Sequence, residues 1–320
     1  MQFFEKCYII GIVENFSFLE NRRESVGRTP KMKTYHIISN PVAGKNKKGK
    51  VIEKVEEILS KIGATFQTHF SKKERDATQI AKALTENGEQ DIIAVGGDGT
   101  LHEVLNGIAD PTACRLGLVP AGTGNDFAEH IGLPLEPEKA MDIILKGETK
   151  PTDYLEVGGI RCMNVAGLGI DVDVLERCRK GKLKGKIKYL MSLIQSLFSF
   201  KGYDVELDID GNVQTRNVLI AAACNGSQFG GGIRICPTAD SGDGKIEAVI
   251  VDSLGGPIKI IQAFIQLMKG KILEYAATTH VLCDRLHCTP KLPCTVQLDG
   301  ELYKDLDFDV RIKQGLQFYR

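Results

Sequence analysis

Two glycine-rich segments in the N-terminal half of the chain combine residue types that suit phosphate binding. They are residues 96–100, Gly-Gly-Asp-Gly-Thr, and residues 122–126, Gly-Thr-Gly-Asn-Asp, and each follows a short apolar run. Because glycine has no Cβ atom, backbone N–H groups in such a turn can approach an anion closely, and a helix that begins after the turn adds the positive end of its dipole. Two turns about one strand–helix unit apart would line one crevice at the carboxyl ends of parallel strands. The pair predicts a nucleotide phosphate chain as the ligand.

Asp98 lies inside the first of these turns. A carboxylate beside bound phosphates is repelled unless it holds a cation or orients a partner. The alternative is that Asp98 caps the helix that we expect from Thr100, by accepting hydrogen bonds from its first backbone N–H groups. Because the second glycine turn is present, we favour the functional interpretation. A third turn, at residues 40–45, contains a glycine and a lysine but lacks the spacing of a Walker P-loop.

The chain around these turns alternates β-rich and helical patterns. We expect strands at 35–39, 64–70, 91–95 and 115–119, and helices at 48–62, 75–86, 100–109 and 136–146. This order predicts a parallel sheet flanked by helices. Near residue 150 the pattern changes to strand runs joined by turn signals such as Asp210-Gly211 and Asp299-Gly300, which predicts a mostly antiparallel domain. The predicted organisation is an N-terminal extension at 1–31, an α/β nucleotide-binding domain at 32–150 and a β-rich domain at 151–320.

Composition narrows the class of protein. The 320 residues are 42% hydrophobic and 26% charged, which is typical of a globular chain with two domains. Basic and acidic residues both number 41, so no overall basic bias points to nucleic acid. Nine cysteines without a Cys-x-x-Cys pair or a secretory leader favour reduced thiols in a cytosolic protein. The group Cys283, His287, Cys288 and Cys294 does not have the spacing of a zinc motif, and we expect no metal there.

Two apolar helical patterns lie in the second half, at residues 187–198 and 261–268. The densest basic run of the chain, residues 177–188, precedes the first of them. A basic segment that leads into an apolar helix face suits an anionic bilayer surface, where each cation gains about 1 kcal/mol. The alternative, which base rates slightly favour, is that the apolar stripe packs on the β-rich domain while the lysines are solvated.

The motifs taken together resemble the diacylglycerol kinase catalytic domain, in particular the soluble bacterial lipid kinases that are related to sphingosine kinases. The resemblance covers residue 34 to about residue 315. It depends on the motifs at residues 40–44, 96–107, 120–128 and 240–244, and the second glycine turn, continued as Asn-Asp-Phe-Ala, makes the combination specific.

This resemblance implies a fold and a reaction. The first domain would be similar to phosphofructokinase and NAD kinase, and the second would be a mostly antiparallel β-sandwich. ATP and Mg2+ would support phosphoryl transfer to a lipid hydroxyl in the interdomain cleft. The residues that would contact the nucleotide are Asn40, Pro41, Val42, Ala43, Gly44, Ser71, Gly97, Asp98, Gly99, Thr100, Leu101, His102, Glu103 and Thr123.

The same residue-by-residue match implies catalytic and metal-binding roles. Glu301 corresponds to the general base, and Asp98, Asp126 and Asp153 correspond to acidic residues of the cleft. Asp243 corresponds to the Mg2+-binding carboxylate, with backbone oxygens of Asp240 and Lys245 beside it.

The local sequence around three of these positions, taken without the resemblance, supports a different interpretation. Glu301 follows an Asp-Gly turn signal, so the local pattern alone indicates a solvent-facing glutamate. His102, at the start of a helix, is by type a surface or packing residue. The segment 240–244 lacks the acidic positions of an EF-hand, and one carboxylate with backbone oxygens suits Mg2+ better than calcium.

We expect a cytoplasmic enzyme that acts transiently at the inner membrane surface, converts diacylglycerol to phosphatidic acid and binds no nucleic acid. A homodimer is expected only by analogy with bacterial relatives. The alternatives are another acceptor, namely a sphingoid base, a phosphatidylglycerol-like lipid or NAD, and a catalytically silent lipid- or nucleotide-sensing module. The chain ends at Arg320, earlier than expected if a C-terminal segment returns to the first domain, which leaves the stability of the domain pairing open.

Overall fold

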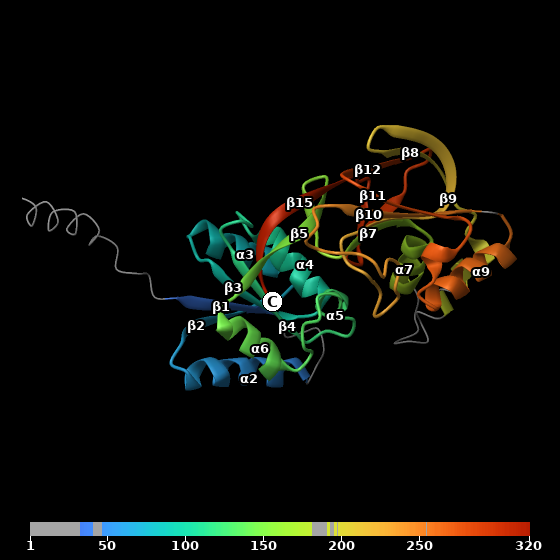
Figure 1. Ribbon diagram of the computed structural model, residues 1–320. Helices are drawn as coiled ribbons and strands as arrows, with labels where there is room; N and C mark the ends of the chain where they lie inside the picture. Colours follow the sequence, from blue (N-terminus) through green and yellow to red (C-terminus); the bar gives the residue numbers. More distant parts are fainter. Residues whose placement is uncertain (1–32, 41–46, 181–190, 193–194, 197, 254) are drawn as a thin grey trace, which may run out of the picture. The chain divides into compact units, whose positions relative to one another are not determined.

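The computed structural model describes residues 33–40, 47–180, 191–192, 195–196, 198–253 and 255–320 (Figure 1). Residues 35–320 form one compact unit. The predicted N-terminal extension, the turn residues Pro41, Val42, Ala43 and Gly44, and most of the basic run at 177–188 lie outside the described residues.

A parallel sheet forms the centre of the N-terminal part. Strands β1 (Thr34–Ser39), β3 (Asp91–Gly96) and β4 (Arg115–Pro120) pair in parallel, and β2 (Thr65–Phe70) lies beside β1. Strands β1, β3 and β4 are buried along almost their whole length because helices cover both faces of the sheet, whereas β2 is partly exposed. Strand bounds differ from the sequence-based expectation by no more than one residue at either end.

Helices divide the N-terminal core into two layers (Figure 1). Helices α2 (Lys47–Lys61) and α6 (Pro137–Lys146) pack on one face through residues such as Leu59 and Met141. Helices α3 (Asp76–Glu86), α4 (Asp98–Gly107) and the short α5 (Asp126–His130) contribute to the other core layer. Helix α4 begins directly after the first glycine turn, and α5 begins directly after the second.

The C-terminal part is an antiparallel β-sandwich with helices packed on it. Its strands are β5 (Thr149–Val157), β6 (Ile160–Cys162), β7 (Val165–Gly169), β8 (Tyr203–Ile209), β9 (Asn212–Cys224), β10 (Ile246–Asp252), β11 (Thr278–Cys283), β12 (Arg285–Pro290), β13 (Thr295–Leu298), β14 (Glu301–Lys304) and β15 (Phe308–Tyr319). The described residues of this part also include helix α7 (Ile170–Lys180), helix α9 (Pro257–Met268), the 3-10 turn η1 (Ile272–Glu274) and helical residues at 191–192, 195–196 and 198–199. Apolar residues of β9 and β10 pack against α9 in a core separate from the one between the strands.

The last strand returns to the N-terminal part, contrary to the expectation from the position of Arg320. β15 pairs with β12 and β5 and then continues in parallel beside β4, where Phe318 lies opposite Leu116. Phe318 packs edge-on against Phe127 at 5.5 Å between ring centroids, and the Tyr319 hydroxyl is hydrogen-bonded to Asp91. One long strand therefore belongs to both parts and connects them.

Candidate active site

The two glycine turns lie against each other at the ends of β3 and β4. A Cβ atom on Gly97 would lie 2.8 Å from the Cα atom of Gly122, so neither turn can carry a side chain at the point of contact. Asn125, which has a left-handed backbone with φ 58°, accepts a hydrogen bond from the Gly122 N–H at 2.8 Å and fixes the second turn. Gly97 is the N-cap of α4 and provides no side-chain cap, so the start of this helix is available to an anion.

Asp98 connects the two turns. Its Oδ1 accepts a hydrogen bond from the Phe127 N–H at 3.3 Å, in the first turn of α5. The alternative that we did not favour, a cap on its own helix, is not the contact that the structure shows, because Asp98 accepts from the first turn of α5, the helix that follows the other glycine turn. Burial raises the pKa of the Asp98 carboxyl, and the neighbouring Asp126 carboxylate raises it further.

Asp126 binds the C-terminal part through the loop at residues 225–245. Its carboxylate accepts hydrogen bonds from Gly231 N–H at 2.9 Å and Gly232 N–H at 2.8 Å, and from the Gln228 side chain at 3.2 Å. Such a buried carboxylate is stable because backbone and amide donors satisfy it. Asp126 therefore fixes the loop over the second glycine turn.

Glu301 faces the first glycine turn from the C-terminal part. It is the first residue of β14, after a turn in which Asp299 and Gly300 both have positive φ, 53° and 83°. Glu301 Oε1 lies 3.8 Å from the position that a Cβ atom on Gly99 would occupy. This places a carboxylate of one part at the start of α4 in the other.

A buried hydrogen-bond network holds the turn before Glu301. Asp299 Oδ2 contacts His102 Nδ1 at 2.9 Å, and His102 Nε2 contacts the Tyr303 hydroxyl at 2.8 Å. The Asp299 carboxylate also accepts the N–H groups of Met163 and Asn164, both at 2.8 Å. Burial alone would raise the pKa of Asp299, but these hydrogen bonds and the His102 ring more than offset it and lower the pKa.

Asp153 belongs to a second acidic group, in which it meets the predicted Mg2+ loop. Its Oδ2 accepts the Gly244 N–H at 2.7 Å. Burial raises the pKa of Asp153, and the carboxylates of Asp243 and Asp240 raise it further. Carboxylate and backbone oxygens are the ligands that Mg2+ prefers, and a divalent cation would relieve this repulsion, so the donor set fits.

Two basic side chains lie at the edges of this loop. Lys245 directs its Nζ to Asp284 at 2.8 Å, so that only its backbone can contribute to the loop. Arg320 donates to the Ser241 hydroxyl at 3.2 Å and adds positive charge near Asp240. The structure thus separates the four predicted catalytic acids into Asp98, Asp126 and Glu301 near the glycine turns and Asp153 beside the Mg2+ loop.

The other residues predicted to contact the nucleotide differ in their position and burial. Asn40 follows β1, and Ser71 is buried after β2, where its N–H donates to Ser39 at 2.9 Å. Thr123 is exposed in the second turn. Thr100 fills the space beside Gly96.

Three further residues of that predicted set direct their side chains into the protein. Leu101 packs in the core, His102 contacts Asp299, and Glu103 Oε2 accepts the Ala77 N–H at 3.1 Å at the start of α3. They follow the first turn along α4, so the helical rotation carries their side chains away from its N terminus.

The sequence analysis missed Asp299, Tyr303 and Gln228 as residues that position the site. Asp299 was interpreted only as part of a hairpin signal, and its partner His102 as a residue that contacts the nucleotide or, from its position alone, as a surface or packing residue. No local pattern could have paired them, since 197 residues separate the two.

Comparison with known proteins agrees with this geometry. The model of the diacylglycerol kinase catalytic domain matches residues 34–157, and that of the YegS C-terminal NAD kinase beta sandwich-like domain matches residues 164–316. The chain is 28% identical to a diacylglycerol kinase of Bacillus subtilis over 84% of its own length and 90% of the relative's. It is 30% identical to a protein of Xanthomonas campestris named "Probable lipid kinase YegS-like", over 81% and 87% of the two chains.

The chain belongs to the diacylglycerol kinase family. Among solved structures, a diacylglycerol kinase from Bacillus anthracis superposes with a TM-score of 0.74 at 26% identity, over 91% of this chain and 98% of that one. Family membership makes this protein an ATP-dependent lipid kinase, and the predicted two-part fold is confirmed. Within the part of the chain that the structure describes, no helix has both the length and the apolar composition needed to cross a bilayer.

Proposed function

We propose that this lipid kinase transfers the γ-phosphoryl group of ATP to the hydroxyl of diacylglycerol, with Glu301 as the general base. The observation that carries the proposal is the position of Glu301 at the start of α4, beside Gly99. A phosphate chain bound by the glycine turns and a lipid hydroxyl bound by Glu301 would meet in this space. Phosphoryl transfer requires mainly that the attacking and leaving oxygens be placed in line and that charge be neutralised.

The chain's own residues divide this work. Backbone N–H groups of the glycine turns and the dipole of α4 bind the phosphates and stabilise the charge that develops on them. Glu301 accepts the hydroxyl proton as the new O–P bond forms and the bond to the β-phosphate oxygen breaks, which releases ADP, and the proton then passes to water. Asp98 would hold Mg2+ bound with ATP, which neutralises phosphate charge, and the loop of Asp243 would hold a second Mg2+ that stabilises the fold.

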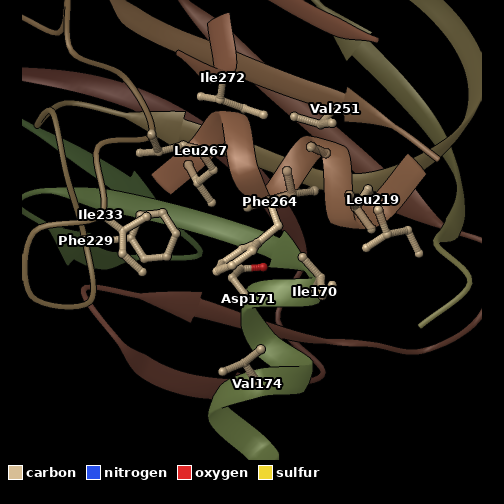
Figure 2. Close-up of a pocket in the computed structure, with 14 residues that line it drawn as sticks. Ile170, Asp171, Val174, Leu219, Phe229, Ile233, Val251, Phe264, Leu267 and Ile272 are labelled. Carbon is tan, nitrogen blue, oxygen red and sulfur yellow. The ribbon is translucent and has the colours of Figure 1, made fainter. Parts of the chain in front are cut away.

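An apolar pocket in the C-terminal part supports a lipid acceptor. Its cavity volume is about 60 Å³, and α7, β9, β10 and α9 contribute most of its lining (Figure 2). Side chains such as Leu219, Phe229 and Phe264 line the pocket together with Asp171, whose buried carboxylate lies beside the Gln297 amide and the backbone N–H groups at the start of α7. Since water occupies about 30 Å³ in the liquid, the pocket accepts only the end of an acyl chain unless side chains such as Phe264 move.

A short chain of contacts links this pocket to the proposed base. Asp171 Oδ2 and Gln297 Nε2 lie 2.8 and 3.2 Å from the position of a Cβ atom on Gly167. Gln297 Oε1 in turn accepts the Gly300 N–H at 2.9 Å, in the turn before Glu301. One side chain therefore separates the pocket from the turn that carries the base.

Asp171 also favours a second candidate acceptor, a sphingoid base. A carboxylate buried among apolar side chains is costly, and an amine or a second hydroxyl on the acceptor would give it a further partner. Diacylglycerol offers only ester carbonyls besides the hydroxyl to be phosphorylated. It would therefore need Asp171 to be protonated, so that the carboxylic acid could donate to an ester carbonyl.

Contact with a membrane would bring the acceptor to the site. Helix α9 is apolar on its outer face as well as its inner one, with Ile258, Ile265 and Met268 exposed. Lys259, in its first turn, and Lys269, which follows it, add positive charge. An apolar face flanked by lysines suits a peripheral contact with an anionic bilayer, which is consistent with a cytoplasmic enzyme at the inner membrane surface.

Labelled ATP tests the proposal directly. The protein is incubated with γ-labelled ATP, Mg2+ and mixed micelles that contain diacylglycerol, sphingosine or phosphatidylglycerol, with NAD as an aqueous acceptor in a parallel reaction. The organic extract and the aqueous phase are then counted. We expect label in phosphatidic acid. Label in sphingosine phosphate would favour the second candidate, and label on NAD or no transfer at all would refute a lipid acceptor.

A further inference from the structure

Three metal-binding side chains meet in the C-terminal part, outside the site described above. Glu247 is on β10, His280 is on β11, and Cys236 is in the loop between β9 and β10. In the antiparallel register His280 lies opposite Val249, two residues from Glu247, so both side chains are on the same face of the sheet. Cys236 belongs to the core that covers this face. Residues that are far apart in the sequence thus present a sulfur, a nitrogen and an oxygen to one point.

The two distances from the Cys236 sulfur in this cluster are close to those between ligands of a tetrahedral ion. Cys236 Sγ lies 3.4 Å from Glu247 Oε2 and 3.9 Å from His280 Nε2. With metal–ligand distances of about 2.0–2.3 Å, neighbouring ligand atoms around tetrahedral zinc are separated by about 3.3–3.6 Å. Glu247 Oε2 and His280 Nε2 are in direct contact, so these two side chains would move apart as an ion takes the place of the hydrogen between them.

Burial and accessibility also suit a cation. Glu247 is only 6% exposed and Cys236 is fully buried, and a carboxylate in such surroundings requires a positive partner. The Thr238 hydroxyl lies 3.3 Å from Glu247 Oε2 and orients the carboxylate, as outer residues do around metal ligands. The His280 side chain is 28% exposed, which gives an ion a path from solvent.

We propose that Cys236, Glu247 and His280 bind a divalent transition-metal cation, with water as the fourth ligand. The ion that we propose is Zn2+. A thiolate and an imidazole favour Zn2+ over Mg2+, which prefers oxygen ligands. Binding releases the thiol proton of Cys236 and any proton on His280 Nε2, and it involves no oxidation or reduction.

Such an ion would anchor the loop at residues 225–245. One end of this loop holds Asp126 through Gly231 and Gly232, and the other holds Asp153 through Gly244. Cys236 lies between these two attachments. The cation would therefore fix the middle of the segment that positions two acidic residues of the site.

Cobalt binding provides a test that does not depend on kinase activity. The intact protein is treated with a chelator, dialysed and titrated with Co2+ under anaerobic conditions, while visible and near-ultraviolet absorption is recorded. We expect one equivalent to bind with tetrahedral d–d bands and a thiolate-to-cobalt charge-transfer band. Zn2+ should displace the Co2+, and excess Mg2+ should not.

Two variants and one control assign the ligands. Cys236→Ser should abolish the charge-transfer band, and His280→Gln should weaken Co2+ binding by about 10-fold or more. His287→Gln, at a partly exposed histidine paired with Asp307, should bind as the unaltered protein does. His280→Gln is the safeguard if Cys236→Ser fails to fold, because the histidine is partly exposed. Absence of stoichiometric binding, or unaltered binding in both variants, would overturn the proposal.

Discussion

His102 and Asp299 form a buried hydrogen bond of 2.9 Å between Nδ1 and Oδ2, across 197 residues of sequence. His102 is in α4, the helix that begins at the first glycine turn, and Asp299 is in the turn that precedes Glu301. The bond therefore joins the phosphate-binding helix to the hairpin that carries the proposed base. Tyr303, on the same hairpin, contacts the other ring nitrogen and fixes the orientation of the imidazole. Since placement at the reacting centre limits the rate of phosphoryl transfer, this pair should matter more for turnover than for ATP binding.

Asp299→Asn tests this positioning. The substitution keeps the shape of the side chain but removes one of the oxygens that accept hydrogen bonds from His102, Met163 and Asn164. We expect kcat to fall by at least about 10-fold while KM for ATP changes by less than about threefold. The free energy of unfolding should fall by about 1–3 kcal/mol, because a buried donor is left unpaired. Asp305→Asn, at an exposed residue of the following turn, is the matched control. Equal losses in kcat for both variants would show that His102 and Asp299 do not position the base.

Glu301→Gln separates chemistry from binding. The amide has the same size as the carboxylate but cannot accept the hydroxyl proton, so turnover should fall by about 10²–10⁴-fold. ATP affinity, measured by calorimetry, should remain close to that of the unaltered protein. Glu274→Gln, at a largely exposed glutamate, should leave both quantities unchanged. Substantial turnover by Glu301→Gln would remove Glu301 from the mechanism.

Much of the N-terminal fold could be predicted from the sequence because the information there is local. Strands buried on both faces read as apolar runs, and the two glycine turns follow them directly. The contact between Gly97 and Gly122 follows from parallel strands whose carboxyl ends share one edge of the sheet. The short helix α5 was missed because five residues do not show a helical period.

The remaining features depend on contacts between distant residues. The return of β15 to β4 joins the end of the chain to residue 115, and the pair of His102 and Asp299 spans a similar distance. Asp153 was expected in the cleft with Asp98, yet it is grouped with Asp243 because β5 lies beside the loop at 225–245. The cluster of Cys236, Glu247 and His280 depends on the register between β10 and β11, which cannot be predicted from the pattern of residues in either strand.

The outer face of α9 gives a prediction about membranes. Ile258→Glu should reduce binding to vesicles that contain phosphatidylglycerol, because a charge replaces an apolar side chain that is 71% exposed. Leu292→Glu is the matched control, since Leu292 is 74% exposed but lies outside α9. The measurement is flotation with vesicles of fixed lipid composition. Equal binding by both variants would exclude α9 as the contact.

Magnesium should stabilise the protein without nucleotide. A cation bound by the loop of Asp243 would relieve the repulsion that raises the pKa of Asp153, so Tm should rise and saturate as Mg2+ is added. Asp243→Asn should remove most of this rise. Asp284→Asn, at a neighbouring exposed acid that pairs with Lys245, should retain it. A Tm that does not respond to Mg2+ would argue against a standing site in this loop.

The buried Asp171 should make the protein less stable to unfolding as pH rises. Burial raises the pKa of its carboxyl to about 6, from a model-compound value near 3.8, so the folded state favours the protonated form. The stabilisation is fully present below the lower value and is lost as pH rises through about 6. Between about pH 5 and pH 7.5 the unaltered protein should therefore lose about 1–2 kcal/mol of unfolding free energy relative to Asp171→Asn, which has no carboxyl to ionise. Denaturant unfolding of both proteins at the two pH values measures this difference. Burial lowers the pKa of His130 to about 4, but both proteins contain this histidine, so its contribution to the unfolding free energy cancels. A difference that does not change with pH would show that Asp171 is not held in the apolar surroundings seen in the pocket.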